Sequence, residues 1–191
     1  MKLARSFYAR PTLEAAQALL GQILVHHSPQ GTTSGVIVET EAYLAQDPAS
    51  HSVRVATPRN KSMFLPPGFS YIYRSYGIHW CFNVATFQEG IGEAVLVRAI
   101  QPIDGLDLMA ERRGLDDPRL LCAGPGRLCQ AFAFSGEKDG IDLLGDTVWL
   151  QPGPAPREIV TTTRIGISRG AELPYRFYIK DSPWISKPRR R

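Results

Sequence analysis

The order of strand-like and helix-like segments is the feature that most constrains the fold of this chain. Runs rich in β-branched and aromatic residues, bounded by Gly, Pro, Ser and Asn, predict strands over residues 22–27, 35–43, 70–74, 78–85, 93–101, 147–151, 159–167 and 176–180. Apolar residues at helical spacing predict helices over residues 12–20, 103–113 and 127–134. Tight turns join the strands at 70–101, which indicates an antiparallel meander. We therefore expect one mixed α+β domain over residues 1–191.

The segments on either side of the predicted hairpin carry less regular signals. The turn-rich run SPQGTTSG should join the strands at 22–27 and 35–43, and Thr12, directly after Pro11, is a cap-type residue for the first helix. Residues 44–68 show no sustained period and many turn formers, so they are expected to form a long irregular loop. Loops of this length in a compact domain are usually functional or disordered.

The strand predicted at residues 35–43 carries two carboxylates on one face. Strict alternation divides its side chains into a face with Val36, Val38, Thr40 and Ala42 and a face with Ile37, Glu39, Glu41 and Tyr43. Two carboxylates and a tyrosine suit a hydrophobic core poorly. A carboxylate among apolar neighbours can act as a general base on water. The alternative is a solvent-facing strand with ordinary acidic residues.

Charge is distributed unevenly along the chain, whose formal net charge is +4. Residues 48–88 contain no Asp or Glu, and the tail KPRRR at 187–191 is basic. The 48–88 segment holds the cations Arg54, Arg59, Lys61 and Arg74 and the aromatic residues Phe64, Phe69, Tyr71, Tyr73, Tyr76, Trp80, Phe82 and Phe87. Such a segment suits a surface that meets phosphates and stacks on bases. A buried aromatic sheet core with a few solvated cations explains the composition equally well.

Three single residues are candidates for function, each with a structural alternative. Tyr76 precedes Gly77 at a predicted turn tip, where it would project outward as a wedge or pack on its neighbours. His51 lies in the irregular loop, where a lone histidine is catalytic or merely a surface residue. Arg98 interrupts the apolar run AVLVRAI, so it needs a carboxylate or aromatic partner.

Other classes of protein lack support in the sequence. The cysteines, Cys81, Cys122 and Cys129, are odd in number and form no C-x-x-C pair, which argues against a disulfide framework and a zinc ribbon. No signal-peptide pattern follows Met1, and no apolar run reaches the roughly 18 to 20 residues of a membrane span. Phosphate-binding glycine loops and the G-x-S-x-G motif are missing. We expect an intracellular protein without a metal or cofactor.

Several blocks, in order along the chain, resemble the alkyladenine (3-methyladenine, methylpurine) DNA glycosylase family. They are IVETEAY (37–43), HS (51–52), TPRN (57–60), MF (63–64), YIYRSYG (71–77), CFN (81–83), VLVRAIQP (95–102), GPGRLCQA (124–131) and RFYIKDSPW (176–184). The blocks together cover nearly the whole chain, which makes the resemblance specific. It implies a compact α+β domain with a curved antiparallel β-sheet and flanking helices.

The resemblance also implies roles for individual residues. Glu41 would activate the attacking water, and Tyr76 would enter the duplex in place of the flipped nucleotide, with Arg59 and Arg74 contacting DNA. The base pocket would contain Tyr43, His51, Tyr73, Asn83 and Arg98. In it the two tyrosines and His51 would sandwich the base, and His51 would also hydrogen-bond the base edge. Asn83 would exclude the 2-amino group of guanine, and Arg98 would support the pocket while contacting the DNA backbone near the lesion.

The implied function is that of a monofunctional DNA glycosylase, which hydrolyses the bond between a damaged purine and its sugar without a metal or cofactor. Its partner would be double-stranded DNA, its state a monomer, and its location the cytoplasm and nucleoid if the source is bacterial. Two other functions stay open on the residues alone. A nucleic-acid-binding module would share the basic aromatic segment but has little reason to place Glu41 on its binding face. A hydrolase of free nucleosides would have no use for the tyrosine turn and the basic tail, and it would not bind long duplex.

Overall fold

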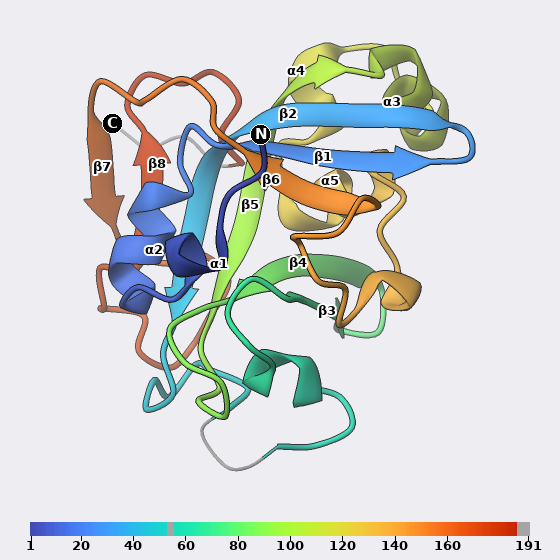
Figure 1. Ribbon diagram of the computed structural model, residues 1–191. Coiled ribbons are helices and arrows are strands. Elements are labelled where there is room, and N and C mark those ends of the chain that lie inside the picture. Colours follow the sequence, from blue (N-terminus) through green and yellow to red (C-terminus); the bar gives the residue numbers. More distant parts are fainter. Residues whose placement is uncertain (53–55, 187–191) are drawn as a thin grey trace.

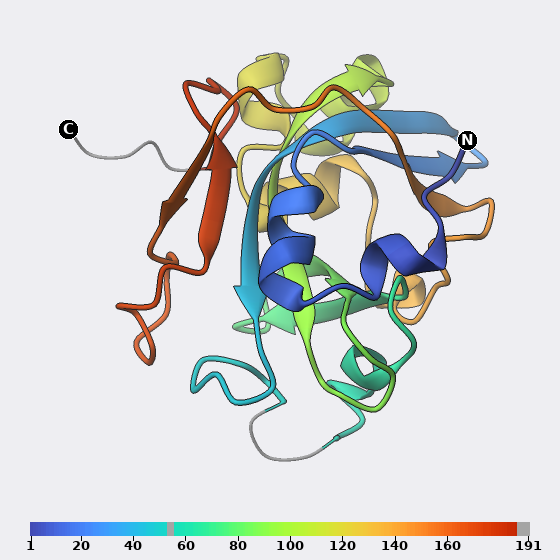
Figure 2. The same ribbon diagram turned by 60° about the vertical axis from the view of Figure 1, so that its left-hand side comes forward.

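The computed structural model describes residues 1–52 and 56–186. Its eight strands form one antiparallel sheet with the path β3-β4-β5-β2-β1-β6, and β8 pairs with both β2 and β7. The strands are β1 Ile23–Ser28, β2 Gly31–Tyr43, β3 Ser70–Ser75, β4 His79–Ala85, β5 Ala94–Asp104, β6 Val148–Gln151, β7 Ile159–Thr162 and β8 Arg176–Ile179. The sheet curls into a half-barrel (Figures 1 and 2). The predicted single α+β domain with a curved antiparallel sheet is confirmed.

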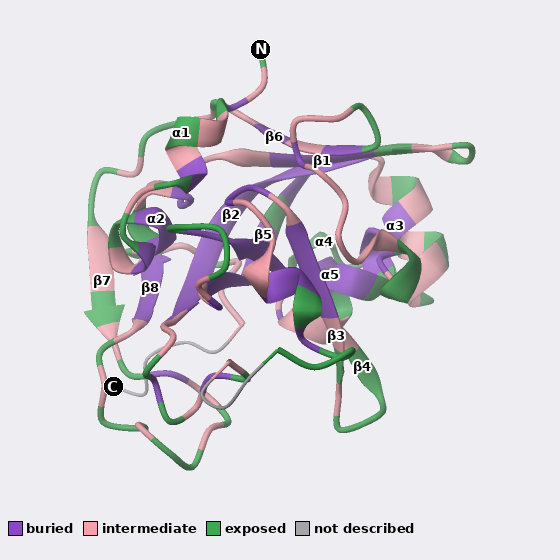
Figure 3. Ribbon diagram, turned by 60° about the horizontal axis from the view of Figure 1, so that its bottom comes forward, coloured by how far each residue is buried: buried purple, intermediate pink, exposed green. Residues whose placement is uncertain are grey.

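Short helices flank the sheet and complete its core. They are α1 Arg5–Tyr8, α2 Thr12–Ala18, α3 Leu106–Arg113, α4 Pro118–Leu121 and α5 Pro125–Ala131, with the 3₁₀ helices η1 Lys61–Phe64 and η2 Gly136–Lys138. Residues from α1, α2 and α5 enter one hydrophobic cluster with the central strands. Burial is greatest along β2 and β5, whereas the β3–β4 turn is exposed (Figure 3). In the described part of the chain, no helix has the length and apolar character needed to cross a membrane.

The first hairpin is tighter than the run of turn formers predicts. Strand β1 ends at Ser28 and β2 begins at Gly31, so the run SPQGTTSG lies largely within the ladder. Thr32 and Thr33 pair with His27 and His26, because β-branched threonines suit a pleated ladder whatever their neighbours. Strand β2 is therefore longer than predicted. It pairs with β1 in its first half and with β8 at residues 39–41.

A β-bulge at Val38 changes which face of β2 each side chain occupies. The β2–β5 register shifts between Ile37 and Glu39 and again between Glu39 and Thr40. A bulge inserts an extra residue and so interrupts strict alternation. Ile37 and Ala42 consequently join the main core, and Thr40 donates its hydroxyl hydrogen to a carbonyl of α2. Val36 and Val38 pack instead in a small cluster with Ala99 on the other side. The predicted grouping of Ile37 with the carboxylates, and of the valines with Thr40 and Ala42, was wrong.

Several predicted boundaries also move. Strand β5 continues through Asp104, which accepts a hydrogen bond from Ser34 of β2, so α3 begins at Leu106 and not at Ile103. The predicted helix at 127–134 begins earlier and ends earlier, as α5. Its first residue is Pro125 of the expected breaker AGPG, because proline suits the first helical position, and its last residue is Ala131. Thr12 is the first residue of α2 and does not cap it; its hydroxyl donates to Glu93.

The largest boundary error concerns β7. Alternation predicts a strand over 159–167, but β7 ends at Thr162 and the chain then leaves the sheet in an irregular segment. The loop predicted at 44–68 is confirmed for its described residues, with η1 as their one short helix; residues 53–55 lie outside the described residues. These two irregular segments border the candidate site.

Candidate active site

A cavity of about 550 Å³ opens where β3, β4 and β5 meet the two irregular segments. Its volume lies in the usual range of small-molecule sites. All five residues predicted to form a base pocket line it, and so do two of the three predicted DNA contacts, Tyr76 and Arg59. The remaining walls come from Ala49, Met63, Tyr71, Ser75, Cys81, Ala94, Leu96, Pro125, Ile165, Gly166 and Ile167.

Glu41 has no exposed surface and does not itself line this cavity, but it is hydrogen-bonded to residues that do. Its Oε2 accepts hydrogen bonds from the Tyr43 hydroxyl, at 2.9 Å, and from Arg98 Nη1, at 3.1 Å. Its Oε1 accepts the backbone amide of Ile165, at 2.8 Å. The three groups that hold this carboxylate all come from residues that line the cavity. These contacts join the Glu41 carboxylate to the cavity wall.

Tyr43 and Arg98 keep the charge states that this arrangement needs. Burial and the neighbouring charge of Glu41 raise the pKa of the Tyr43 phenol, so its hydroxyl keeps the proton that it donates. Burial disfavours the charged form of Arg98, but the charges of Glu41 and Glu39 outweigh it and raise the pKa of the guanidinium. The prediction that Arg98 needs a carboxylate or aromatic partner is confirmed, since it pairs with both Glu41 and Glu39.

Glu39 is equally buried but has different partners. Its Oε1 accepts Arg176 Nε at 2.6 Å and lies 3.3 Å from Arg98 Nε, and its Oε2 accepts the backbone amide of Ser186 at 2.6 Å. Neither Arg176 nor Ser186 lines the cavity. Glu39 therefore joins β2 to β8 and the segment after it, while Arg98 bridges the two carboxylates.

The aromatic wall of the cavity comes from β3 and the irregular loop. The ring of His51 stands nearly perpendicular to that of Tyr73, with centroids 4.5 Å apart, and its Nδ1 lies 2.8 Å from the Tyr71 hydroxyl. Partial burial and the nearby charge of Arg59 lower the pKa of His51, so the ring is neutral at pH 7. A neutral imidazole can both donate and accept a hydrogen bond at a ligand edge.

Asn83 is fixed in place at the back of the cavity. Its Nδ2 donates to the carbonyl oxygens of Tyr71, at 3.0 Å, and of Cys81, at 3.1 Å. The side chain is buried, so the carboxamide has little freedom to turn away from a ligand.

Tyr76 stands at the rim with 87% of its surface exposed. Tyr76 and Gly77 both have positive φ, at 49° and 69°, and Ser75 accepts a hydrogen bond from the amide of Ile78. This is a tight hairpin turn of the type that positive φ at both central residues defines. Ile78 beside it is 66% exposed. The turn holds two apolar side chains out in solvent, as predicted for Tyr76.

The basic aromatic segment divides between surface and core, and contact of its exposed residues with phosphates or bases stays a prediction. Tyr71 and Phe82 are buried, whereas Arg59, Lys61 and Arg74 are exposed. Arg59 Nη2 donates to the Arg74 carbonyl, and the Arg74 guanidinium lies over the Trp80 ring. Arg74 does not line the cavity. Arg54 and the basic tail 187–191 lie outside the described residues.

Comparison with known proteins gives a consistent result. A model of the family described as Methylpurine-DNA glycosylase (MPG) matches residues 6–183. The chain belongs to this family. A relative from Methanoculleus marisnigri is 50% identical over 98% of this chain and 100% of its own length. A relative from Rhodopseudomonas palustris is 48% identical over 97% of this chain and 88% of its own length. A relative from Chlorobaculum tepidum is 50% identical over 97% of this chain and 91% of its own length. All three relatives are named "Putative 3-methyladenine DNA glycosylase". Family membership makes the chain a DNA glycosylase, a hydrolase of N-glycosyl bonds in DNA repair.

Sequence reasoning missed part of this candidate site. Ile165 was placed in a strand, and Tyr71 was given no role. Tyr71 shares the alternation of Tyr73 along β3, which would have placed both rings on one face. No local signal could have found Ile165, because its contribution is a backbone amide. Among the described residues, no group of three His, Cys, Asp or Glu side chains is placed to hold a metal ion.

Proposed function

We propose that this methylpurine-DNA glycosylase is monofunctional, flips alkylated or deaminated purines out of duplex DNA, and hydrolyses the N-glycosidic bond to leave an abasic site. One observation carries the proposal. A buried carboxylate, Glu41, is held by Tyr43, Arg98 and Ile165 under an aromatic-lined cavity that is large enough for a purine. The enzyme would act as a monomer inside the cell, where its duplex substrate lies, in the cytoplasm and nucleoid if bacterial.

In the chemical step, Glu41 would act as the general base. The water oxygen forms a bond to C1′ of the sugar, its proton passes to Glu41, and the electrons of the C1′–N bond leave with the purine. An alkylated purine carries a positive charge and leaves readily, so the protein mainly supplies the oriented water and a negative charge near the cationic sugar. Arg98 would support this geometry through its bonds to Glu41 and Glu39, and its contact with the DNA backbone stays a prediction.

Recognition of the base would fall to the cavity walls. Flipping costs a few kcal/mol and costs least at damaged or mispaired bases, while aromatic stacking returns about 1 to 3 kcal/mol per base. Tyr43, His51 and Tyr73 supply the rings, and His51 the hydrogen bond to the base edge. The fixed amide of Asn83 would meet the 2-amino group of guanine.

Tyr76 at the exposed turn would fill the space that the flipped nucleotide leaves. Arg59 and Arg74, both exposed beside this turn, would contact phosphates. Binding of the duplex should accordingly weaken as salt concentration rises.

The direct test is incubation of the protein with a duplex that carries one alkylated or deaminated adenine, followed by hot alkali to cleave abasic sites. We expect strand cleavage at the lesion after alkali and none without it. The same duplex left intact at saturating protein would contradict the proposal. If only free nucleosides are hydrolysed, the substrate class is wrong.

Two additions to that assay test the mechanism. Because the family resemblance places a carboxylate and not a lysine at the reacting carbon, borohydride should trap no protein–DNA adduct. We also expect EDTA to leave the rate unchanged. A trapped adduct would indicate Schiff-base chemistry, and activity lost in EDTA and restored by a divalent cation would indicate a metal.

A further inference from the structure

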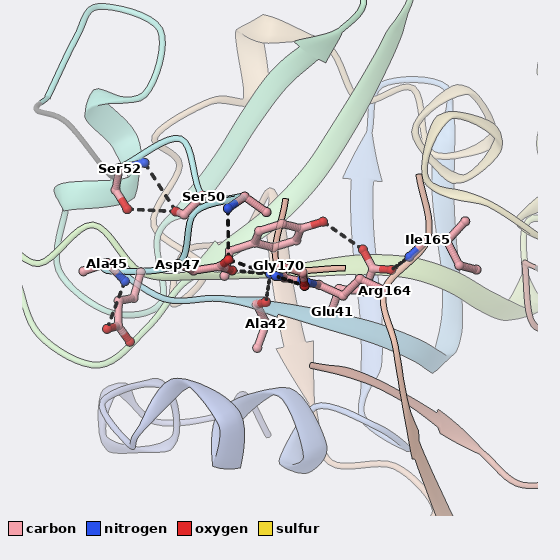
Figure 4. Close-up of polar contacts among 12 residues, drawn as sticks. Glu41, Ala42, Ala45, Asp47, Ser50, Ser52, Arg164, Ile165 and Gly170 are labelled. Carbon is pink, nitrogen blue, oxygen red and sulfur yellow. Dashed lines mark hydrogen bonds and ion pairs between the residues drawn. The ribbon is translucent and has the colours of Figure 1, made fainter. Parts of the chain in front are cut away.

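A buried ion pair joins the two irregular segments beside the cavity (Figure 4). Arg164 follows β7 and Asp47 follows β2, and their side chains are 0% and 1% exposed. Arg164 Nη2 donates to Asp47 Oδ1 at 2.9 Å, while Nη1 donates to Oδ2. The guanidinium also donates to the carbonyl oxygens of Ala42, at 3.0 Å, and Gly170, at 3.2 Å. This planar fork fixes one segment against the other.

The same guanidinium lies behind a wall of the cavity. Its carbon is 4.8 Å from the ring centroid of Tyr43 and 5.3 Å from that of Tyr175, so the cation contacts both aromatic faces. The next residue, Ile165, donates its amide to Glu41 (Figure 4). Arg164 therefore adjoins two of the groups that bind Glu41. It precedes Ile165 in the chain, and it contacts the ring of Tyr43.

Asp47 extends the arrangement into the opposite loop. Its Oδ1 accepts the amide of Ala49 at 3.0 Å, and its carbonyl oxygen accepts the amide of Ser50 at 2.8 Å. Ala49 and His51 both line the cavity. The carboxylate that fixes Arg164 therefore also shapes the turn from which His51 extends.

We propose that Arg164 and Asp47 are positioning residues, which hold Glu41, Tyr43 and the loop of His51 in their working geometry. The inference rests on the proposed function and adds to it. Neither residue touches the space where a base would lie; they act through the Ile165 amide, the Tyr43 ring and the Ala49 turn. A displacement of about 1 Å in such a site can cost on the order of 100-fold in rate.

The test compares two variants of the pair with a matched control. Asp47→Asn removes the charge, and Arg164→Lys keeps the cation but loses the planar fork. Asp142→Asn is the control, because Asp142 likewise accepts both an arginine, Arg5, and the amide two residues further on. The residue that donates this amide, Leu144, does not line the cavity, whereas Ala49 does. Single-turnover excision, affinity for undamaged duplex, thermal unfolding and hydrogen exchange of peptides covering residues 163–170 are measured for each.

We expect Asp47→Asn to speed exchange at 163–170 and to slow excision by about 10- to 100-fold, with undamaged-duplex affinity unchanged. The exchange rate and the excision rate of Arg164→Lys should lie between those of Asp47→Asn and the wild type. If Asp47→Asn does not fold, Arg164→Lys alone is compared with the control. Asp142→Asn should excise normally. The proposal would be overturned if hydrogen exchange at 163–170 does not change in the two variants. It would also be overturned if excision falls only in proportion to the loss of thermal stability, as in the control. If the wild type excises nothing, the proposed function fails, while the exchange data still decide whether the pair holds the segment.

Discussion

Glu39 and Glu41 lie two residues apart on β2, are both fully buried and both pair with Arg98, yet they face different structures. Glu39 binds Arg176 and the Ser186 amide, which join the sheet to the end of the described chain. Among the described residues, the groups that Glu41 binds belong to residues that line the cavity: Tyr43, Arg98 and Ile165. Burial and ion pairing therefore do not distinguish Glu39 from the proposed general base, Glu41. The two carboxylates differ because Tyr43 and Ile165 line the cavity, whereas Arg176 and Ser186 do not.

If Glu39 is structural, removing its charge should lower the unfolding free energy far more than removing the charge of an exposed glutamate. Glu39→Gln keeps a carbonyl for the Ser186 amide but leaves Arg176 facing a neutral group. Breaking a buried pair by changing one partner typically costs about 3–5 kcal/mol of unfolding free energy. Urea denaturation measures the loss, and Glu158→Gln, in the exposed pair with Lys180, is the control. A loss no larger than that of the control would contradict the structural role.

Tyr76→Ala should weaken binding to a lesion duplex by the value of one stacking contact, about 1 to 3 kcal/mol, and leave undamaged-duplex affinity nearly unchanged. Phe87 is the matched control, since it is also exposed with positive φ, at 67°, but does not line the cavity. Titrations with both duplexes measure the effect. If Tyr76→Ala prefers the lesion duplex as strongly as the wild type does, Tyr76 does not act as a wedge. The proposal that the cavity binds the flipped base would then be weaker as well.

Asn83→Ser should relax discrimination against guanine. The shorter side chain leaves room for the 2-amino group, and a pocket distinguishes a single group of this size by about 1–3 kcal/mol at most. The measurement is excision of normal guanine relative to a deaminated adenine in the same duplex context. If this ratio does not rise, Asn83 has no excluding role.

The smallest expected effect is the pH dependence of stability at His51. Its pKa is lowered in the folded chain, so both states are neutral above the usual value of about 6.5. Below that pH the unfolded chain takes up the proton first, and the unfolding free energy falls as the pH falls. Uptake of one proton limits the slope from His51 to ~1.4 kcal/mol per pH unit, and the exposure of the ring to solvent should keep it below this limit. His51→Gln should remove it and Glu39→Gln should not; an unchanged slope in His51→Gln contradicts the assignment.

The sheet was predictable from local patterns because strand alternation and turn residues are local signals. The meander of β3, β4 and β5 and the partner needed by Arg98 followed directly. The failures have physical causes outside the local pattern. A bulge reversed the faces of β2 after Val38. The chain leaves the sheet after Thr162, in a segment where Arg164 contacts Asp47, a residue far away in sequence.

The site was predictable in its residue types but not in its geometry. The resemblance named side chains that do gather at one cavity, yet residues alone could not separate Glu39 from Glu41, since both share a face and an arginine. Their difference lies in a backbone amide of Ile165 and in the position of Ser186, which only the folded chain brings near. Backbone donors of this kind leave no trace in residue type.

Single-turnover excision from one lesion duplex by Glu41→Gln and Glu39→Gln tests the central claim most directly. Both changes keep size and remove one charge, and protein concentrations above the dissociation constant keep the duplex bound. Loss of a general base costs about 10²- to 10⁴-fold, so Glu41→Gln should bind the lesion but excise it that much more slowly. Glu39→Gln, corrected for its folded fraction, should excise at nearly the wild-type rate. Normal excision by Glu41→Gln, or its loss in Glu39→Gln alone, would contradict the account.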